Sequence, residues 1–529
     1  MALLPSLAHG GAVGGPASAP GVAARPVTAR ACGVKRRLLG WRPVRTAARS
    51  AKGPTLLPVL PQLLTRAAVR ATSIFYELSR GGMELPPGPI LVVANHPNSW
   101  MDALVVFCTS GRKVRPLARA PLFDKPGVGH VLRGLGGLPV YRPEDAPHLV
   151  GRNAATFDAA AGALRRGEAV LIFPEGRSHS ESGLAPLKTG AARIALRAEA
   201  ASDWRLGLRI VPIGLAYKRK TAFRGRAAAL VGEPLSVAPW QEAYRRDNVA
   251  AAQALTATIA TALERVTLRL SDTVDAELLV AAEALYAVER GLAPRRDGEL
   301  AAHLPRLKLF EGGVHWLRAH DPERLERLEA AVGSYRSRLA RLGIAVGELP
   351  ERHPAHKTLR SIGTQALIAG LELPLACLGI AAWYLPYASP RPVLLFYEPV
   401  YEARATFKLV TGMLAFPLAY AAWLVLAWRL GGGPVAGAAA VILPLAGLST
   451  LHWRRHWDEF VQDLRFLRRA LRRHGLAAQL RSRREAIAAE IDRVAADWEL
   501  QAGEGREEGP APGLAPRREG SPDGPATPP

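Results

Sequence analysis

Residues 92–102 read VVANHPNSWMD, and the rest of the chain can be understood outward from them. The apolar run before Asn95 is typical of a buried strand, and a helix-like stretch begins at Ser99. The turn between them carries His96, and Asp102 follows six residues later. A histidine at a strand end with a carboxylate nearby is typical of a general base, because the carboxylate fixes the imidazole tautomer and stabilises its protonated form. Ser99 and Asp102 also fit a helix capping box, so the segment alone leaves both interpretations open.

The bulk properties of the chain indicate an anionic partner. The 529 residues carry a formal charge of +23, are 49% hydrophobic, and contain no acidic residue before Glu77. Such a chain favours nucleic acid, anionic lipid or acidic substrates. Long uncharged segments in the C-terminal half favour lipid, and no nucleic-acid motif is present. Cys32, Cys108 and Cys377 match no disulfide or metal-binding spacing, so neither a disulfide nor a metal site is predicted.

Between residues 89 and 235 short apolar runs alternate with helical stretches. We predict strands at 90–94, 114–118, 138–141, 169–173, 209–217 and 227–231, and helices at 99–109, 147–166 and 189–198. This alternation predicts an α/β layered domain, in which chemistry lies at strand ends such as the one that carries His96. A basic amphipathic helix from Leu56 to Leu78, ended by Gly81 and Gly82, should lead into this domain and lie on a membrane surface.

Three further clusters stand at comparable strand ends: GGLPVYR from Gly136 to Arg142, FPEGRSH from Phe173 to His179, and VPI at 211–213. Each has a simple structural explanation when it is taken alone. Arg142 would be a surface ion-pair residue, Glu175 would cap a turn, and Pro212 would mark an edge strand or a bulge.

Taken together, the clusters resemble the glycerolipid acyltransferase family, typified by bacterial 1-acylglycerol-3-phosphate and glycerol-3-phosphate acyltransferases. The matching blocks are Asn95-His96…Asp102, Gly136…Arg142, Phe173-Pro174-Glu175-Gly176 and Val211-Pro212-Ile213, with weaker similarity at 188–193 and 231–235. The resemblance covers about residues 65–240. It implies a mixed sheet flanked by helices, followed here by a helical region and C-terminal transmembrane helices.

Two departures from the usual family pattern refine the resemblance. Five residues separate His96 from Asp102 instead of four, and Arg177-Ser178-His179 follows Gly176 where Thr-Arg-Ser is usual. Both features are similar to the branch that contains fungal glycerol-3-phosphate and dihydroxyacetone-phosphate acyltransferases. They shift the expected acceptor toward glycerol 3-phosphate and leave the role of Arg177 open.

The resemblance implies a role for each motif residue. His96 would deprotonate the acceptor hydroxyl, with Asp102 on its other ring nitrogen. An arginine fork suits a phosphate dianion, so Arg142 is the expected phosphate ligand. The expected substrate-binding residues are Arg142, Glu175, Gly176, Arg177 and Lys188. Glu175 would bond a hydroxyl of the acceptor and Gly176 would permit its close approach, while Arg177 and Lys188 are alternatives for a second phosphate contact. No metal-ligand spacing, nucleophile elbow or Walker loop is present, and no cofactor is expected beyond acyl-CoA or acyl-carrier protein as donor.

Beyond residue 240 the sequence becomes helical and then strongly apolar. An Asp321-capped helix with a hydrophobic stripe should pack on helical partners. Ser361–Pro386, Leu409–Trp428 and Gly433–Leu451 are each long enough, or nearly so, to cross a membrane. Arginines after the last segment indicate a cytoplasmic C-terminal side, and a cytoplasmic catalytic domain then requires an even number of crossings. Ser361–Pro386, with Glu372 and Pro374, is the candidate for a re-entrant segment, so the choice between two and three crossings stays open.

The predicted organisation has six parts: a disordered basic tail (1–55), an acyltransferase domain (56–240), a helical region (241–360), membrane segments (361–452), a basic helical region that could lie on anionic lipid (453–500), and a disordered tail (501–529). We expect an integral membrane O-acyltransferase of phospholipid biosynthesis that acts on glycerol 3-phosphate. Alternatives are lysophosphatidate or glycerone phosphate as acceptor, or a membrane lipid-binding protein that has lost catalysis. Nucleic-acid binding is disfavoured by the long uncharged segments.

Overall fold

The computed structural model describes residues 60–125, 127–142, 147–181, 183–268, 273–292, 300–342, 355–397, 399–470 and 476–504. The predicted disordered segment 1–55 lies outside this part of the chain. The predicted tail 501–529 does so from residue 505 onward, and its first four residues end a helix.

The described residues form a mixed eight-stranded sheet in the order β1-β7-β6-β2-β5-β3-β4, with β8 paired to β6. Its strands are β1 Tyr76–Gly82, β2 Ile90–Ala94, β3 Val114–Arg119, β4 Leu138–Val140, β5 Ala169–Ile172, β6 Arg209–Lys218, β7 Gly225–Val231 and β8 Leu235–Ser236. β2 lies at the centre and is parallel to both β5 and β6, whereas β6 is antiparallel to β7 and β8. The carboxyl ends of β2, β3, β4 and β5 therefore meet at one edge of the sheet.

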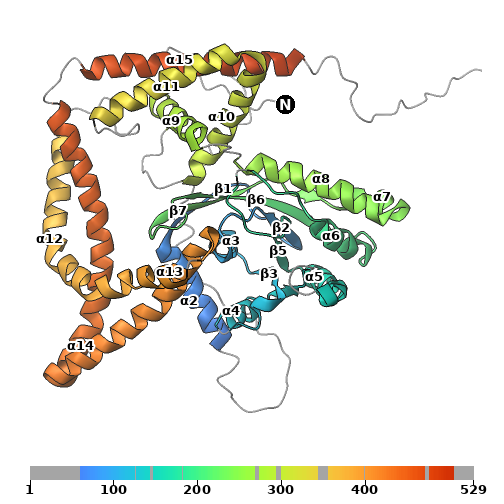
Figure 1. Cartoon of the computed structure of the whole chain (residues 1–529), viewed down its shortest axis with the longest axis horizontal. Coiled ribbons are helices and arrows are strands. Elements are labelled where there is room, and N and C mark those ends of the chain that lie inside the picture. Colours follow the sequence, from blue (N-terminus) through green and yellow to red (C-terminus); the bar gives the residue numbers. More distant parts are fainter. Residues whose placement is uncertain are drawn as a thin grey trace, which may run out of the picture.

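Helices cover both faces of the sheet, as the α/β prediction requires (Figure 1). Leu91 and Val93 of β2 pack on one side against α5 (Asn153–Arg165), α6 (Gly190–Ala200) and α8 (Asn248–Val266), which follows the short α7 (Gln241–Arg246). Ile90, Val92 and Ala94 pack on the other side against α2 (Leu60–Phe75) and α3 (Trp100–Ser110). A strand buried on both faces reads as a continuous apolar run, which is how β2 reads in the sequence.

The predicted helix from Leu56 to Leu78 is wrong at its end. α2 ends at Phe75, and Tyr76–Gly82 forms β1, which pairs in parallel with β7. Because the partner strand lies about 150 residues further along the chain, local periodicity gives no sign of this pairing. Gly82 ends the strand at φ +78°, where Met83 N–H donates to the Val231 carbonyl at 2.9 Å.

Pro212 does not mark an edge strand, because β6 lies between β2 and β7. Its position instead agrees with a bulge. Pairing with β7 ends at Ile213 and pairing with β8 begins at Ile210, so Pro212 stands where the antiparallel ladder is interrupted. Its carbonyl still accepts a hydrogen bond of 2.9 Å from Gly232 N–H. Proline, which has no backbone N–H, is tolerated where the strand pairing does not need a hydrogen-bond donor.

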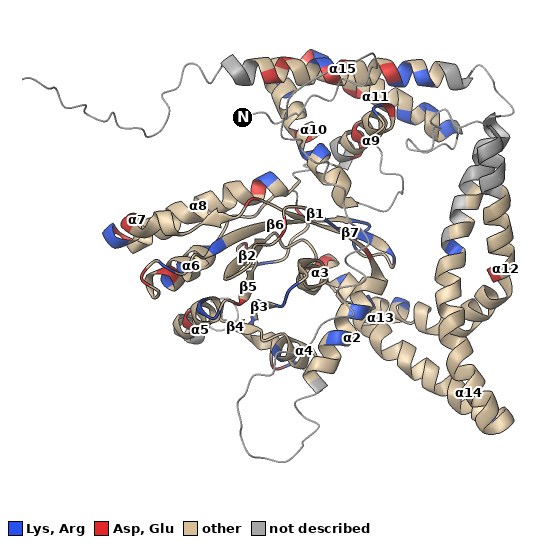
Figure 2. Ribbon diagram, turned by 180° about the vertical axis from the view of Figure 1, so that it is seen from behind, with Lys and Arg blue, Asp and Glu red and all other residues tan. Residues whose placement is uncertain are grey.

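A second, helical layer lies above the sheet and consists of α9 (Thr273–Glu289), α10 (Leu300–His320), α11 (Pro322–Leu342) and α15 (Leu476–Glu504) (Figure 1). Asp321 caps α11 as predicted, since its Oδ1 accepts from Arg324 N–H at 3.0 Å. Figure 2 shows charges of both signs along α11 and α15. Part of that charge is paired between the two helices, as in the bonds from Arg324 to Glu490 (2.6 Å) and Asp497 (2.7 Å). α15 therefore packs on protein through one face, which the prediction of a lipid-bound basic helix did not foresee.

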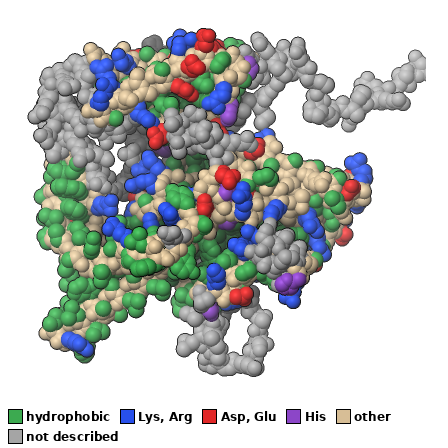
Figure 3. All heavy atoms as spheres, viewed as in Figure 1, with side chains coloured by type: hydrophobic (Ala, Val, Ile, Leu, Met, Phe, Trp, Pro, Cys, Tyr) green, Lys and Arg blue, Asp and Glu red, His purple; other side chains and the backbone are tan. Residues whose placement is uncertain are grey.

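The apolar part of the chain forms α12 (Ala355–Ala388), α13 (Pro390–Tyr397) and α14 (Arg404–Ala470). α14 reverses direction at Gly431 and Gly432, which have non-helical backbone angles, so it contains two arms. Gly363–Tyr397 and Tyr401–Arg454 are the two stretches of the described chain that are long and apolar enough to cross a membrane. Figure 3 shows hydrophobic side chains gathered over the surface of this part of the molecule.

Candidate active site

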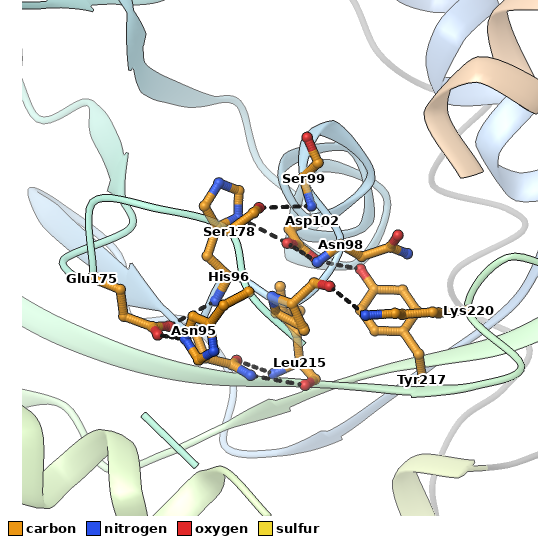
Figure 4. A network of polar contacts seen from close by, with 12 residues as sticks. Asn95, His96, Asn98, Ser99, Asp102, Glu175, Ser178, Leu215, Tyr217 and Lys220 are labelled. Carbon is orange, nitrogen blue, oxygen red and sulfur yellow. Dashed lines mark hydrogen bonds and ion pairs between the residues drawn. The ribbon is translucent and has the colours of Figure 1, made fainter. Parts of the chain in front are cut away.

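His96 and Asp102 face each other across the turn between β2 and α3 (Figure 4). The imidazole Nδ1 lies 2.8 Å from Asp102 Oδ2. Asp102 is completely buried, whereas 17% of the His96 side chain is exposed. Phe173 stacks on the imidazole with ring centroids 4.0 Å apart, which holds the ring plane from the β5 side. The arrangement can accept a proton on one side of the ring and stabilise the resulting charge from the other.

The capping box, which was one of two interpretations of Ser99 and Asp102, does not form. Ser99 occupies the N-cap position with φ 51°, but its side chain makes no capping hydrogen bond. Asp102 turns back instead, and its Oδ2 accepts from Asn98 N–H at 2.7 Å as well as from the imidazole. The Ser99 N–H is bound by Ser178 Oγ at 2.9 Å. The helix start therefore presents the carboxylate to His96, which the five-residue spacing allows.

Tyr217 supplies a third hydrogen bond to Asp102, from the end of β6. Its hydroxyl donates to Asp102 Oδ1 at 2.6 Å. Removal of this hydroxyl from solvent, together with the nearby Asp102 charge, raises the pKa of Tyr217 well above its usual value, so it remains a donor. Sequence reasoning missed this residue. The available signal was a polar hydroxyl at the end of the apolar strand predicted for 209–217.

Glu175 lies in the turn after β5 and binds the backbone of the neighbouring loops. Its Oε1 accepts from His96 N–H at 2.9 Å, and its Oε2 accepts from Ala185 N–H at 3.0 Å. The same carboxylate pairs with the buried His179 imidazole, and His179 N–H donates to the His96 carbonyl at 3.2 Å. Both carboxylate oxygens therefore have protein partners, and Glu175 fixes the main chain on either side of His96. An open contact with an acceptor hydroxyl, as expected from the resemblance, is not what these bonds describe.

Gly176 and Lys188 lie against each other beside this turn. Gly176 has φ +72°, and a Cβ placed there would lie 2.9 Å from Lys188 Cε. Lys188 N–H is bound to the Pro174 carbonyl at 2.8 Å, so the two segments are joined at the backbone as well. Arg177, in contrast, is largely exposed and pairs with Glu181 at 3.5 Å.

Arg142 follows β4, at the same edge of the sheet as His96 and Glu175 but separated from β2 by two strands. The neighbouring turn is fixed by Asn153, which binds both the N–H (2.9 Å) and the carbonyl (2.6 Å) of Tyr141. Over the residues that the structure describes, no group of three or more His, Cys, Asp or Glu could hold a metal ion.

A polar junction that the sequence did not reveal joins this site to the apolar helices. Lys220 donates to the Pro97 carbonyl at 2.9 Å and to Ser180 Oγ at 2.7 Å. Ser180 is in turn hydrogen-bonded to Glu402, just before α14. Lys220 also lies over the Tyr401 ring, 4.7 Å from its centroid. The loop that carries His96 is thus tied to the first turn of the apolar segment.

Comparison with known proteins shows what this site is similar to. The acyltransferase family model matches residues 79–216, which include every motif residue described above. These residues are similar to the acyltransferase family. Glycerol-3-phosphate O-acyltransferase 2 of Saccharomyces cerevisiae is 42% identical over 85 residues, 16% of this chain and 11% of that protein. An uncharacterized acyltransferase of Schizosaccharomyces pombe is 31% identical over 188 residues, 34% of this chain and 26% of that protein.

Each of these matches covers only part of this chain. The chain spans only about a tenth to a quarter of the length of these curated relatives. Among solved structures, the 1-acyl-sn-glycerophosphate acyltransferase of Thermotoga maritima matches 34% of this chain and 70% of its own, at 20% identity and a TM-score of 0.26. The match to the acyltransferase family model and the mixed sheet found in the strand topology agree with the resemblance read from the motifs.

Proposed function

We propose that this protein is a membrane-bound O-acyltransferase that transfers a fatty acyl group from acyl-CoA or acyl-carrier protein to glycerol 3-phosphate. The observation that carries the proposal is the pair formed by His96 and the buried Asp102, 2.8 Å apart. It stands at the carboxyl end of the central strand within the residues that match the acyltransferase family. A partly exposed imidazole oriented by a buried carboxylate suits the removal of a proton from an alcohol.

The reaction proceeds as a direct transfer. His96 Nε2, the ring nitrogen opposite Asp102, takes the hydroxyl proton as the acceptor oxygen attacks the thioester carbonyl. The tetrahedral intermediate then collapses, the C–S bond breaks, and the departing thiolate takes the proton back from the imidazolium. The Asp102 carboxylate stabilises the imidazolium between the two steps, and general base catalysis of this kind contributes about 10²- to 10⁴-fold. Neither an acyl-enzyme nor a separate cofactor enters this scheme.

The residues around the pair divide into positioning and binding groups. Glu175 fixes the His96 main chain from one side through its bonds to His96 and Ala185. Lys188, beside Gly176, and Arg142, after β4, supply the cations for the acceptor phosphate from the same edge of the sheet. A guanidinium binds phosphate in a bidentate manner and an ammonium as a point charge, so the two would act together. We keep Arg177, which pairs with Glu181, as an alternative to Lys188.

The choice of acceptor rests on the similarity to glycerol-3-phosphate O-acyltransferase 2 of yeast and on the five residues between His96 and Asp102. Lysophosphatidate and glycerone phosphate share the phosphate and hydroxyl that the site would bind. They remain the alternatives within the same chemistry.

We also propose that the apolar helices α12 and α14 lie in a membrane, with the acyltransferase domain and the C-terminal helices on its cytoplasmic side. The support is the length and apolar surface of Gly363–Tyr397 and Tyr401–Arg454, and the arginine-rich sequence that follows them. In this position the acyl product leaves the site beside the lipid phase that dissolves it.

The test is an acyl-transfer assay with defined lipids. The detergent-purified full chain is incubated with labelled palmitoyl-CoA or palmitoyl-acyl-carrier protein and, separately, with glycerol 3-phosphate, glycerone phosphate and lysophosphatidate. His96→Ala is the matched control, and we expect it to lower turnover by about 10²-fold or more. Arg142→Ala should chiefly raise the KM for the phosphorylated acceptor. A His96→Ala variant with near-normal turnover would refute the catalytic assignment, and an unchanged KM in Arg142→Ala would refute its phosphate role.

A membrane lipid-binding protein without catalysis is the competing proposal. It predicts that no acceptor in this panel is acylated, although the chain binds vesicles. Product formation that depends on His96 excludes it.

A further inference from the structure

We propose that Tyr217 is a positioning residue that sets the proton affinity of the His96–Asp102 pair through its hydrogen bond to the carboxylate. The inference rests on the proposed function and deepens it. It begins from the geometry: Asp102 Oδ2 receives His96 Nδ1 and Asn98 N–H, while Oδ1 receives Tyr217 alone. The hydroxyl therefore binds the oxygen that does not bind the imidazole.

The position of the tyrosine limits it to this role. Its hydroxyl lies on the side of Asp102 away from His96, and its ring packs 5.6 Å from that of Tyr76 (Figure 4). Its pKa is raised well above the usual value, so the hydroxyl stays protonated through the working pH range and can only donate to the carboxylate. Tyr217 therefore reaches the acceptor hydroxyl only through Asp102 and His96.

The direction of its effect follows from charge. A donor to Asp102 stabilises the anion and reduces the negative charge that faces the imidazole. Without the hydroxyl the carboxylate attracts a proton more strongly, whether that proton resides on the imidazole or on the carboxylate itself. Because His96 and Asp102 share a hydrogen bond, the loss of the donor acts on the pair as a whole, which then holds its proton to a higher pH. The acid limb of the rate profile should shift upward.

The other groups around the pair define the control. The titratable or charged groups nearby are Tyr76 from β1, Tyr217 from β6, Lys220 from the turn after β6, and Glu175 and His179 from the turn after β5. Tyr76 is the closest match to Tyr217. Its hydroxyl accepts from Asn98 Nδ2 at 2.8 Å and donates to the Lys220 carbonyl, and it makes no hydrogen bond to Asp102.

The experiment compares Tyr217→Phe with Tyr76→Phe in the full-length protein, by kcat/KM for glycerol 3-phosphate between pH 5 and 9. We expect Tyr217→Phe to move the midpoint of the acid limb upward by about 0.5 to 1 pH unit and to lower kcat about tenfold at neutral pH. Tyr76→Phe should leave the midpoint where it is in the wild type, whatever its effect on kcat. Equal midpoints in all three proteins would overturn the proposal, because a purely structural role would change rates without moving the midpoint.

A second readout separates this inference from the acyltransferase assignment. The rate at which diethyl pyrocarbonate modifies His96, taken as the difference between wild type and His96→Gln, titrates with the imidazole and needs no acyl transfer. The same upward shift in Tyr217→Phe supports the role of Tyr217 even where no acceptor is acylated, and an unshifted rate refutes it.

A third variant keeps the test decisive if Tyr217→Phe fails to fold. Replacement of Tyr217 by 3-fluorotyrosine retains the hydroxyl but makes it a stronger donor. It should move both midpoints downward, the opposite of the phenylalanine variant. A fluorotyrosine protein with an unchanged or higher midpoint contradicts the inference.

Discussion

Asp102→Asn is the perturbation whose outcome the geometry determines most closely. The wild-type carboxylate accepts three hydrogen bonds while fully buried, from Asn98 N–H, His96 Nδ1 and Tyr217. An asparagine has one acceptor oxygen and one donor group at the same positions. The backbone N–H of Asn98 can only donate, so the amide oxygen must take the place of Oδ2. The amide nitrogen then faces Tyr217, whose hydroxyl can rotate to accept.

This orientation of the amide determines how far kcat should fall. Because the amide oxygen still accepts from Nδ1–H, His96 keeps its productive tautomer and only the negative charge is lost. A hydrogen bond to a charged group contributes about 1.5–3 kcal/mol, against about 0.5–1.5 for a neutral pair. Together with the lost stabilisation of the imidazolium, we expect kcat to fall about 10- to 100-fold. The kcat of His96→Ala, which lacks the base itself, should be lower still.

The assay measures initial rates of acyl transfer to glycerol 3-phosphate for the wild type, Asp102→Asn and Asp158→Asn. Asp158 of α5 forms an exposed ion pair with Arg197 of α6, so its variant controls for the loss of one carboxylate. Circular dichroism and thermal unfolding establish that each variant is folded. An Asp102→Asn enzyme within threefold of the wild type would refute the role of the carboxylate. A loss as large as that of His96→Ala would show that the amide adopts the opposite orientation.

Three further outcomes follow from neighbouring contacts. Gly176→Ala places a Cβ at φ +72° against Lys188, which costs about 1–2 kcal/mol of stability. It should raise the KM for glycerol 3-phosphate more than it lowers kcat, and an unchanged KM would show that Lys188 does not bind the phosphate. Lys220→Met removes the bond that holds the Pro97 carbonyl and should lower kcat about tenfold in a folded protein; full activity would show that the junction is dispensable. Burial raises the pKa of Cys108 to about 12, so the folded protein holds the thiol proton more strongly than the unfolded chain. The contribution of the buried thiol to the free energy of unfolding is complete below the pKa of the unfolded thiol and is lost as pH rises toward 12. Iodoacetamide at pH 8 should therefore alkylate Cys108 only in denaturant, and mass spectrometry that finds it modified in the folded protein would contradict its burial.

Much of the sheet could be predicted because its strands have a clear pattern in the local sequence. The strands at 90–94, 114–118 and 169–173 are apolar runs closed by turn residues, and they match β2, β3 and β5 to within a residue. β1 could not be predicted in the same way. Its sequence, YELSRGG, follows an amphipathic helix without a break, and its partner β7 becomes visible only when the chain has folded.

The site shows the same limit. Residue types and spacing brought His96 and Asp102 to attention, because that chemistry is local to one turn. The partners of Glu175 could not be predicted, since two of its bonds come from main-chain N–H groups that carry no sequence signature. A glutamate in a motif is easily assigned to the substrate, whereas its buried position here gives it a structural task.

The arrangement of the apolar helices bears on how many times the chain would cross a membrane. The sequence offered three candidate segments, although a cytoplasmic location of both flanking regions asks for an even count. α14 contains two of them, and its turn uses Gly432 at φ 65° and ψ −156°, a conformation that only glycine readily adopts. The third segment lies in α12, which packs along the second arm through a 3.0 Å bond from Trp383 to the Leu443 carbonyl and ends at Ala388, where α13 leads the chain back toward the sheet (Figure 1). In the membrane orientation that we propose, the two arms of α14 cross the membrane and α12 is a re-entrant segment. Three apolar segments are then compatible with an even number of membrane crossings.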